Sequence, residues 1–367
     1  MAKATALNPL YNRSAHLFRN CEEGPRELDK KEMDTIALLE SEIQALEDGG
    51  ASLKRSLFRG FSVSSPLGVA SGPAYGSKFL GLYTRLGYGF VTQKTVRDRI
   101  WEGNPVPNVL YLKGGDFESG FVTSDAPTLM MTNSFGMTSI DPGEWERDLA
   151  SFSRTHEEPL IISGVATKAA TRSENIEQYV KLGVVSERIG ANAYEINVSC
   201  PNEMEGHSGE LQDDLGFLSE VLLELKDTLT IPILIKIGHR EDLSRLVLSV
   251  GKILDGIGGF VAINTKPAVV RKDDGSYAYG EGRPRAGINM KPLAPFAKDA
   301  LRQLVRIRKQ SGYDFRIFNV GGILTPEDVA ERLEMGADAV ESAGAAMTDP
   351  YLGLETKKYL LEKASGR

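Results

Sequence analysis

A thiol stands among amides in residues 195–203, which read EINVSCPNE. The segment is an apolar, β-branched run that ends in Asn197, Cys200 and Asn202 rather than in ordinary turn residues. A cysteine whose thiolate is stabilised by its neighbours can act as a base or as a nucleophile. Taken alone, Cys200 would be interpreted as a small buried apolar side chain at a strand end. Its surroundings therefore decide whether this thiol carries chemistry.

Four asparagines share one kind of position along the chain. Each stands at the end of an apolar run or in the segment just after it: Asn133, Asn197, Asn202 and Asn264. An amide side chain offers both donors and an acceptor, so a ring of amides suits a ligand with alternating carbonyl and N–H groups, such as a pyrimidine. For any one of them the competing interpretation is a turn or loop cap.

Lysines and glycines end other apolar runs. Lys94 ends the run 89–94 and Lys236 lies in the run 231–237, whereas the runs 315–322 and 338–344 end in glycine-rich segments. Glycines at such positions allow backbone N–H groups to approach a phosphate closely. A buried lysine would stabilise a group that accumulates negative charge, such as a reduced flavin ring. These features fit phosphosugar isomerases as well as flavin enzymes. The four histidines show no spacing typical of a metal site, so no metal is expected.

The elements that would position these side chains alternate between strand and helix. Apolar runs that read as strands are separated by amphipathic segments such as SENIEQYVKLG and TPEDVAERLEMG, the latter with the Thr-Pro-Glu start of a helix. Eight such strands predict a parallel (β/α)8 barrel, the TIM-barrel fold, which brings all strand ends to one rim. A doubly wound sheet is the alternative, but no strand–GxGxxG–helix unit is found. The eight strands are expected at 66–71, 89–94, 160–164, 193–199, 231–237, 260–265, 315–322 and 338–344.

Two insertions and an amino-terminal segment interrupt this rhythm. About 65 residues separate the second and third strands and include a further apolar run at 128–133. Residues 266–292 are predicted as a loop that precedes a long helix. Residues 27–50 have helical periodicity and end in Gly49-Gly50, which predicts a surface helix. We expect residues 1–60 to form a partly helical extension and 61–367 to form the catalytic barrel.

Composition limits the classes of partner. The net charge of −7 and pI near 5.4 argue against nucleic acid or an anionic membrane as the main partner. Two cysteines cannot form a disulfide framework, which favours a reducing compartment. No stretch approaches the ~20 apolar residues of a membrane span, and we expect a cytoplasmic location.

Together the motifs resemble those of a known family, the dihydroorotate dehydrogenases. The similarity extends over about residues 60–350 and is carried by NVSCPN (197–202), TNSFG (132–136), VTQKT (91–95) with GNPVP (103–107), INT (263–265) and NVGG (319–322). The resemblance implies a barrel that binds FMN and oxidises dihydroorotate to orotate in de novo pyrimidine biosynthesis. It also implies a base for the C5 proton, while hydride passes from C6 to flavin N5.

The resemblance assigns roles to individual positions. Cys200 matches the catalytic base of the family, and its thiol predicts an activity that rises with pH. Lys94 matches a lysine between flavin and substrate, and Lys236 matches one near the flavin N1/O2 edge. The amides that match substrate ligands are Asn133, Asn197, Asn202 and Asn264. Contacts to FMN are expected from Ala70, Ser71, Lys94, Asn197, Lys236, Thr265, Gly287, Gly321, Gly322, Gly344 and Ala345.

Partners and alternatives follow from the same comparison. A cysteine base resembles the soluble members, which form homodimers or pair with an iron–sulfur flavin subunit that passes electrons to NAD, whereas quinone-reducing members use serine. The chain differs from the usual family pattern near Thr138 and at Lys266-Pro267. These differences leave open a related flavoenzyme acting on another dihydropyrimidine. Two alternatives come from other classes of protein: a flavin-free phosphate-binding barrel, and a non-enzymatic binding or scaffold protein.

Overall fold

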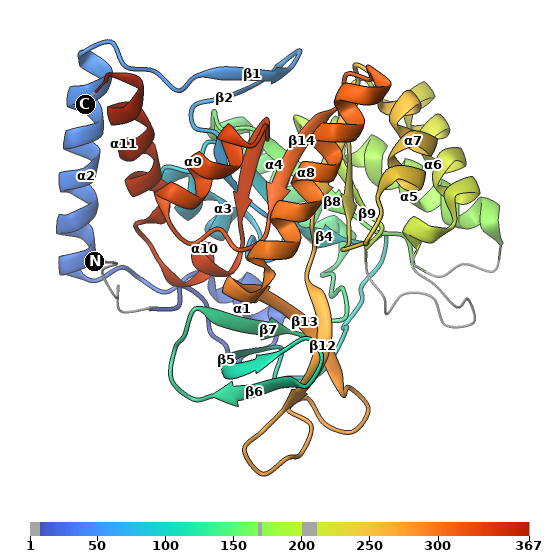
Figure 1. Ribbon diagram of the computed structural model, residues 1–367, viewed down its shortest axis with the longest axis horizontal. Coiled ribbons are helices and arrows are strands. Elements are labelled where there is room, and N and C mark those ends of the chain that lie inside the picture. The colour runs from blue at the N-terminus through green and yellow to red at the C-terminus, as the bar shows by residue number, and fades with distance from the viewer. Residues whose placement is uncertain (1–7, 168–170, 200–210, 367) are drawn as a thin grey trace.

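Eight parallel strands close into a barrel at the centre of the molecule (Figure 1). The computed structural model describes residues 8–167, 171–199 and 211–366. All eight predicted strands are present and neighbour one another in chain order, so the predicted (β/α)8 TIM barrel is confirmed. They are β3 (Leu67–Val69), β4 (Val91–Val96), β8 (Leu160–Gly164), β9 (Ala193–Asn197), β10 (Ile233–Ile237), β11 (Gly258–Ala262), β14 (Arg316–Val320) and β15 (Ala339–Ser342).

Helices follow the strands and form the outer layer (Figure 1). The start of α9 carries the expected capping residues: Thr325 accepts a hydrogen bond from the Asp328 backbone N–H, and Pro326 is the first residue of the helix. α8 ends at Ser311 and is followed by Gly312, which adopts the left-handed conformation with φ 74°. The outer helices are α3 (Ser77–Arg85), α4 (Pro142–Thr155), α5 (Arg172–Arg188), α6 (Leu215–Thr228), α7 (Ser244–Leu254), α8 (Ala294–Ser311), α9 (Pro326–Glu334) and α11 (Leu352–Ala364).

A short hairpin closes the amino-terminal end of the barrel. Its strands, β1 (Arg55–Phe58) and β2 (Phe61–Val63), pair antiparallel. Phe61 is fully buried against the barrel residues Phe90 and Phe318, with ring centroids 6.3 and 6.4 Å away. These aromatic rings fill the barrel floor, so ligands are restricted to its other end.

A second, smaller barrel of five strands covers the opposite, carboxyl-terminal end (Figure 1). The expectation of a loop over 266–292 was wrong, because residues 266–271 and 285–290 are strands. Alternate residues of the second strand, Ala286, Ile288 and Met290, are buried, which is the period of a half-buried strand. The prediction failed because the turn between the two strands is rich in Gly and Asp, which are typical of loops. The five strands are β5 (Val109–Asp116), β6 (Gly120–Ser124), β7 (Met130–Asn133), β12 (Lys266–Arg271) and β13 (Arg285–Met290).

The amino-terminal helix packs on the barrel domain. The predicted surface helix is α2 (Lys30–Asp48), which lies along α11 and buries Ile36 and Ile43 (Figure 1). Ion pairs also join the two helices, for example Lys357–Glu47 at 2.9 Å. A domain boundary near residue 60 stays a prediction. The remaining helical segments are α1 (Leu17–Glu23), α10 (Gly344–Thr348) and the 3₁₀ turns η1 (Leu211–Asp213) and η2 (Lys291–Leu293).

No helix within the described ranges combines the length and the apolar character that crossing a membrane requires.

Candidate active site

A cavity of about 520 Å³ lies where the carboxyl ends of the eight-stranded barrel meet the small five-stranded barrel, whose strands are called the small sheet below. It is lined by every described residue that the sequence assigned to substrate or cofactor. Cys200 and Asn202 lie outside the described residues. The predicted residues that line the cavity are Ala70, Ser71, Lys94, Asn133, Asn197, Lys236, Asn264, Thr265, Gly287, Gly321, Gly322, Gly344 and Ala345.

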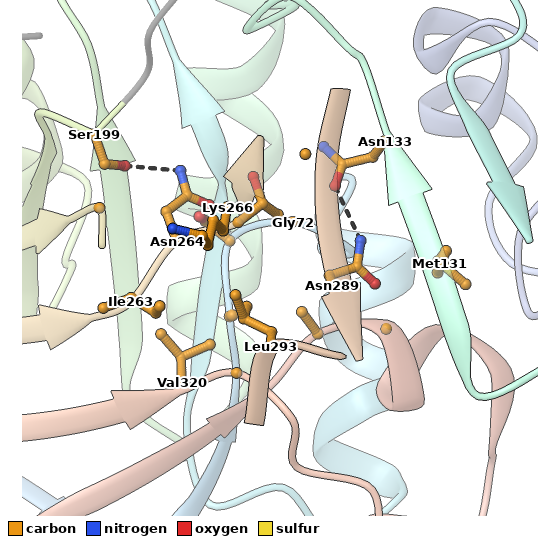
Figure 2. Close-up of a pocket in the computed structure, with 18 of the residues that line it drawn as sticks. Gly72, Met131, Asn133, Ser199, Ile263, Asn264, Lys266, Asn289, Leu293 and Val320 are labelled. Carbon is orange, nitrogen blue, oxygen red and sulfur yellow. Dashed lines mark hydrogen bonds between the residues drawn. The ribbon is translucent and has the colours of Figure 1, made fainter. Parts of the chain in front are cut away.

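A chain of hydrogen bonds orders the amides on the barrel side. The Asn264 amide donates to Ser199 Oγ at 2.7 Å (Figure 2). Ser199 Oγ in turn donates to Asn197 Oδ1 at 2.9 Å. Asn197 Nδ2 in turn donates to Thr95 Oγ1 at 3.2 Å, and the Thr95 and Ser163 hydroxyls lie 3.0 Å apart. Because each bond fixes the next side chain, the amides are held before any ligand arrives.

A second amide pair belongs to the small sheet. Asn289 Nδ2 donates to Asn133 Oδ1 at 3.0 Å, and both side chains line the cavity (Figure 2). The pair forms because β13 and β7 run antiparallel, with Gly287 opposite Asn133. The buried Asn289 Oδ1 has no hydrogen-bond partner among the described residues. It therefore offers an acceptor to a ligand in the cavity.

Two lysines bring positive charge into this space. Lys236 is only 3% exposed, and its ammonium donates to Ser71 Oγ at 3.1 Å. Lys236 lies opposite Asn197 in the β10–β9 register, so the cation and the amide project from neighbouring strands. The Lys94 ammonium lies 5.5 Å from the centre of the Phe135 ring. Buried ammonium groups in a cavity favour an anionic or electron-rich ligand.

Close backbone packing shapes the side of the cavity formed after β14 and β15. A Cβ at Gly322 would collide with Ala294, and one at Gly344 would collide with Met290. Gly322 also has φ +72°, which favours glycine. Arg332 of α9 is fully buried and donates to the Gly321 carbonyl at 3.5 Å, while its Nε and Nη1 have no partner among the described residues. Bare backbone and a nearby guanidinium suit a phosphate group.

The charges around the cavity are predominantly positive. Glu341 is the one carboxylic acid among the described residues that line it, against three lysines and two arginines. The third lysine, Lys266, lies 3.2 Å from His239 Nδ1 and over the rings of Phe117 and Phe296. Burial, and next the Lys266 ammonium, lower the pKa of His239. A neutral imidazole beside Lys266 leaves the positive charge of that lysine available to an acidic ligand.

Several lining residues were absent from the sequence-based prediction. Asn289, Ser199 and Thr95 complete the amide network, and Glu341 lies in the barrel wall. Ser199 stands inside the NVSCPN segment, so its position was a usable signal. Asn289 depends on the β7–β13 pairing, which the loop prediction for 266–292 excluded.

Comparison with known proteins identifies the family. The model of the family described as dihydroorotate dehydrogenase matches residues 53–362. The chain belongs to the dihydroorotate dehydrogenase family.

Relatives in this family differ in their named electron acceptors. The chain is 29% identical to a dihydroorotate dehydrogenase of Dictyostelium discoideum, over 81% of this chain and 86% of the relative. It is 27% identical to the catalytic subunit of an NAD(+)-linked dihydroorotate dehydrogenase B of Halalkalibacterium halodurans, over 80% and 87%. It is 28% identical to a quinone-linked dihydroorotate dehydrogenase of Thermus thermophilus, over 77% and 75%.

The two departures from the usual pattern of the dihydroorotate dehydrogenase family occupy different places. Thr138 is not among the cavity-lining residues, and its hydroxyl donates to the Phe135 carbonyl at 2.8 Å. Lys266 and Pro267 do line the cavity. The substitution at Lys266 is therefore the one placed to affect a ligand.

Proposed function

We propose that this chain catalyses the FMN-dependent oxidation of dihydroorotate to orotate in de novo pyrimidine biosynthesis. The observation that carries the proposal is the cavity itself, which joins the buried Lys236 to two hydrogen-bonded amide sets in a member of the dihydroorotate dehydrogenase family. The relatives named for dihydroorotate support the same substrate.

The residues present fit FMN. Lys236 keeps donors beyond its bond to Ser71 and would hold the N1/O2 edge of the ring. Gly321, Gly322 and Gly344 line the cavity with bare backbone, and their N–H groups would hold the phosphate. FMN, when bound, supplies the acceptor for the hydride that leaves C6 of the substrate. The other proposed FMN contacts are Ala70, Ser71, Lys94, Asn197, Thr265, Gly287 and Ala345.

The substrate ring would be held by amides from both sheets. Asn197 and Asn264 approach from the barrel, and Asn133 approaches from β7 with its Oδ1 hydrogen-bonded to Asn289. Asn202 is proposed to join them. The ammonium of Lys94 would attract the substrate carboxylate and orient C6 toward the ring of the cofactor.

Cys200 is proposed as the base that removes the C5 proton. Ser199, the preceding residue, lines the cavity and is fixed by Asn197 and Asn264. A free thiol has a pKa of about 8.5, so a Cys200 thiolate becomes more abundant as pH rises toward that value. The reaction should therefore accelerate between neutral and alkaline pH.

Formation of orotate by two cysteine variants tests this assignment. Cys200→Ala should lower kcat by about 100-fold or more, because the proton-abstracting group is lost. Cys21→Ala is the matched control: Cys21 is a half-buried free thiol in α1, and it should leave kcat unchanged. A Cys200→Ala enzyme that keeps the wild-type rate across pH 6 to 9 would refute the role of Cys200.

Oxidation of a different dihydropyrimidine, one that lacks the carboxylate of dihydroorotate, is the second candidate function. It is suggested by the unusual Lys266-Pro267 pair in the cavity wall. The surplus of positive charge around the cavity favours the acidic substrate instead. Comparing turnover of dihydroorotate and dihydrouracil separates the two, since the carboxylate is the difference between them.

A homodimer, or a complex with an electron-transferring subunit, is the proposed assembly. The soluble-type cysteine motif and the relative named as a catalytic subunit support it. A cytoplasmic location is proposed with it. The apparent mass of the native protein in sedimentation distinguishes monomer from dimer.

A further inference from the structure

A buried polar layer lies between the aromatic barrel floor and the cavity. Its members point inward from four strands, each two residues beyond an inward apolar residue of the floor, as the two-residue strand period requires. All are at most 3% exposed. They are Thr92 of β4, Glu195 of β9, Lys236 of β10 and Glu341 of β15.

The charges in this layer do not balance. Lys236 brings one ammonium, whereas Glu195 and Glu341 bring two carboxyl groups, both 0% exposed. Thr92 donates to Glu341 Oε1 at 3.1 Å, but Glu341 Oε2 and both oxygens of Glu195 have no hydrogen-bond partner among the described residues. Two ionised carboxylates here would leave an uncompensated buried negative charge, which costs several kcal/mol. A proton on Glu341 removes this imbalance.

Glu341 is the member placed to respond to a ligand. It lines the cavity together with Lys236 and with Ser71, the partner of Lys236. Burial and the neighbouring Glu195 raise the pKa of Glu341 to about 8, against the opposing effects of Lys236 and Thr92. Lys94, two residues beyond Thr92 on β4, is the next charged group toward the rim.

We infer that the Glu341 carboxylate takes up a proton when negative charge develops on the ligand edge held by Lys236. The inference rests on the proposed function, because that edge is then the N1/O2 edge of FMN. When FMN is bound, its uptake of two electrons and one proton would leave one negative charge on the ring beside Lys236. In that field the Glu341 carboxylate binds one further proton from solvent, and it releases this proton when FMN is reoxidised. No substrate bond is made or broken by Glu341.

The measurable consequence is the number of protons taken up per two electrons. It follows from the pH dependence of the midpoint potential of bound FMN, recorded by absorbance in an electrochemical cell without substrate. For the wild-type holoenzyme we expect one proton per two electrons at neutral pH. Over a range of alkaline pH, called here the uptake window, we expect more than one proton per two electrons. Glu341→Gln should stay at one throughout, because the amide cannot bind the proton.

Two neighbouring variants move the same window in opposite directions. Glu195→Gln removes a like charge, so the window should shift to lower pH. Thr92→Val removes the donor that stabilises the carboxylate, so the window should shift to higher pH. These two shifts decide the inference even if Glu341→Gln does not fold. Glu334→Gln, an exposed acid at the end of α9, is the control and should reproduce the wild-type curve.

The possible failures are distinguishable. A protein that binds no FMN would overturn the proposed function and this inference together. A protein that binds FMN but shows one proton per two electrons at every pH would overturn only the inference. So would a Glu341→Gln variant with the wild-type window, or Glu195→Gln and Thr92→Val variants that leave it in place.

Discussion

Lys236 is the residue on which the cofactor proposal depends most. Its ammonium is almost completely buried, and its one hydrogen bond within the described structure goes to Ser71. We predict that Lys236→Met weakens FMN binding by about 10- to 100-fold, the usual effect of losing a hydrogen bond from a charged group. Titration of the apoprotein with FMN, followed by flavin fluorescence, measures this change.

The control for that substitution is Lys226→Met, at an exposed position in the last turn of α6. It removes an equal charge without touching the cavity, so FMN affinity should stay at the wild-type value. Equal FMN affinity in both variants would show that Lys236 does not contact the cofactor.

Glu341 gives the protein a pH-dependent stability. Its pKa is raised to about 8 in the folded protein, whereas the ordinary value is 4.5. Between these values the folded state keeps a proton that the unfolded state releases, so the free energy of unfolding falls as pH rises through this window. Relative to wild type, Glu341→Gln should therefore become more stable from pH 5 to pH 8, by on the order of a few kcal/mol. Urea unfolding of the apoproteins at both pH values measures the difference, and a pH-independent difference would contradict the protonation of Glu341.

Much of the site at this scale could be predicted from residue types at strand ends. Asn197 ends β9 and Asn264 follows β11, whereas Lys94 and Lys236 lie in the carboxyl-terminal halves of β4 and β10. Barrel geometry brings these parts of the strands together. Asn289 could not be predicted in the same way. Its partner Asn133 is 156 residues away in the chain, and the contact exists only because β13 pairs with β7.

At the scale of elements, the β1–β2 hairpin seals the barrel floor. Phe61 is fully buried among Phe58, Phe90 and Phe318. We predict that Phe61→Ala lowers the free energy of unfolding by about 3–5 kcal/mol, because a large cavity opens in the floor. Denaturant unfolding measures this loss, and FMN affinity at low temperature should be unaffected, since the floor lies at the opposite end from the cavity. A loss below about 1 kcal/mol would show that the hairpin is not part of the packed core.

The strands and helices of the large barrel were accessible from sequence, whereas in the small five-stranded barrel only the apolar run 128–133, which contains β7, stood out. Fully buried parallel strands are continuous apolar runs, as in 231–237, and they stand out without knowledge of their neighbours. β12 begins with Lys266-Pro267 and is separated from β13 by a polar turn. Its strand character depends on pairing with β6 and β13, which are remote contacts that no local pattern reports.

For the whole molecule, the amino-terminal helix is part of the packed structure. Ile36 and Ile43 of α2 are buried, and its ion pairs reach α11. We predict that Ile43→Ala lowers the free energy of unfolding by about 2–5 kcal/mol and keeps a single thermal transition. Calorimetry checks both points. A separate early transition would instead support residues 1–60 as an independent unit.

The proposed function makes this molecule a flavin enzyme that oxidises dihydroorotate. The most direct measurement mixes the purified holoenzyme with dihydroorotate in the absence of oxygen and follows the visible absorbance of the bound flavin. The flavin band should bleach as one equivalent of orotate appears. A colourless protein that cannot be loaded with FMN, or a flavin band that persists with dihydroorotate but bleaches with dithionite, would contradict it.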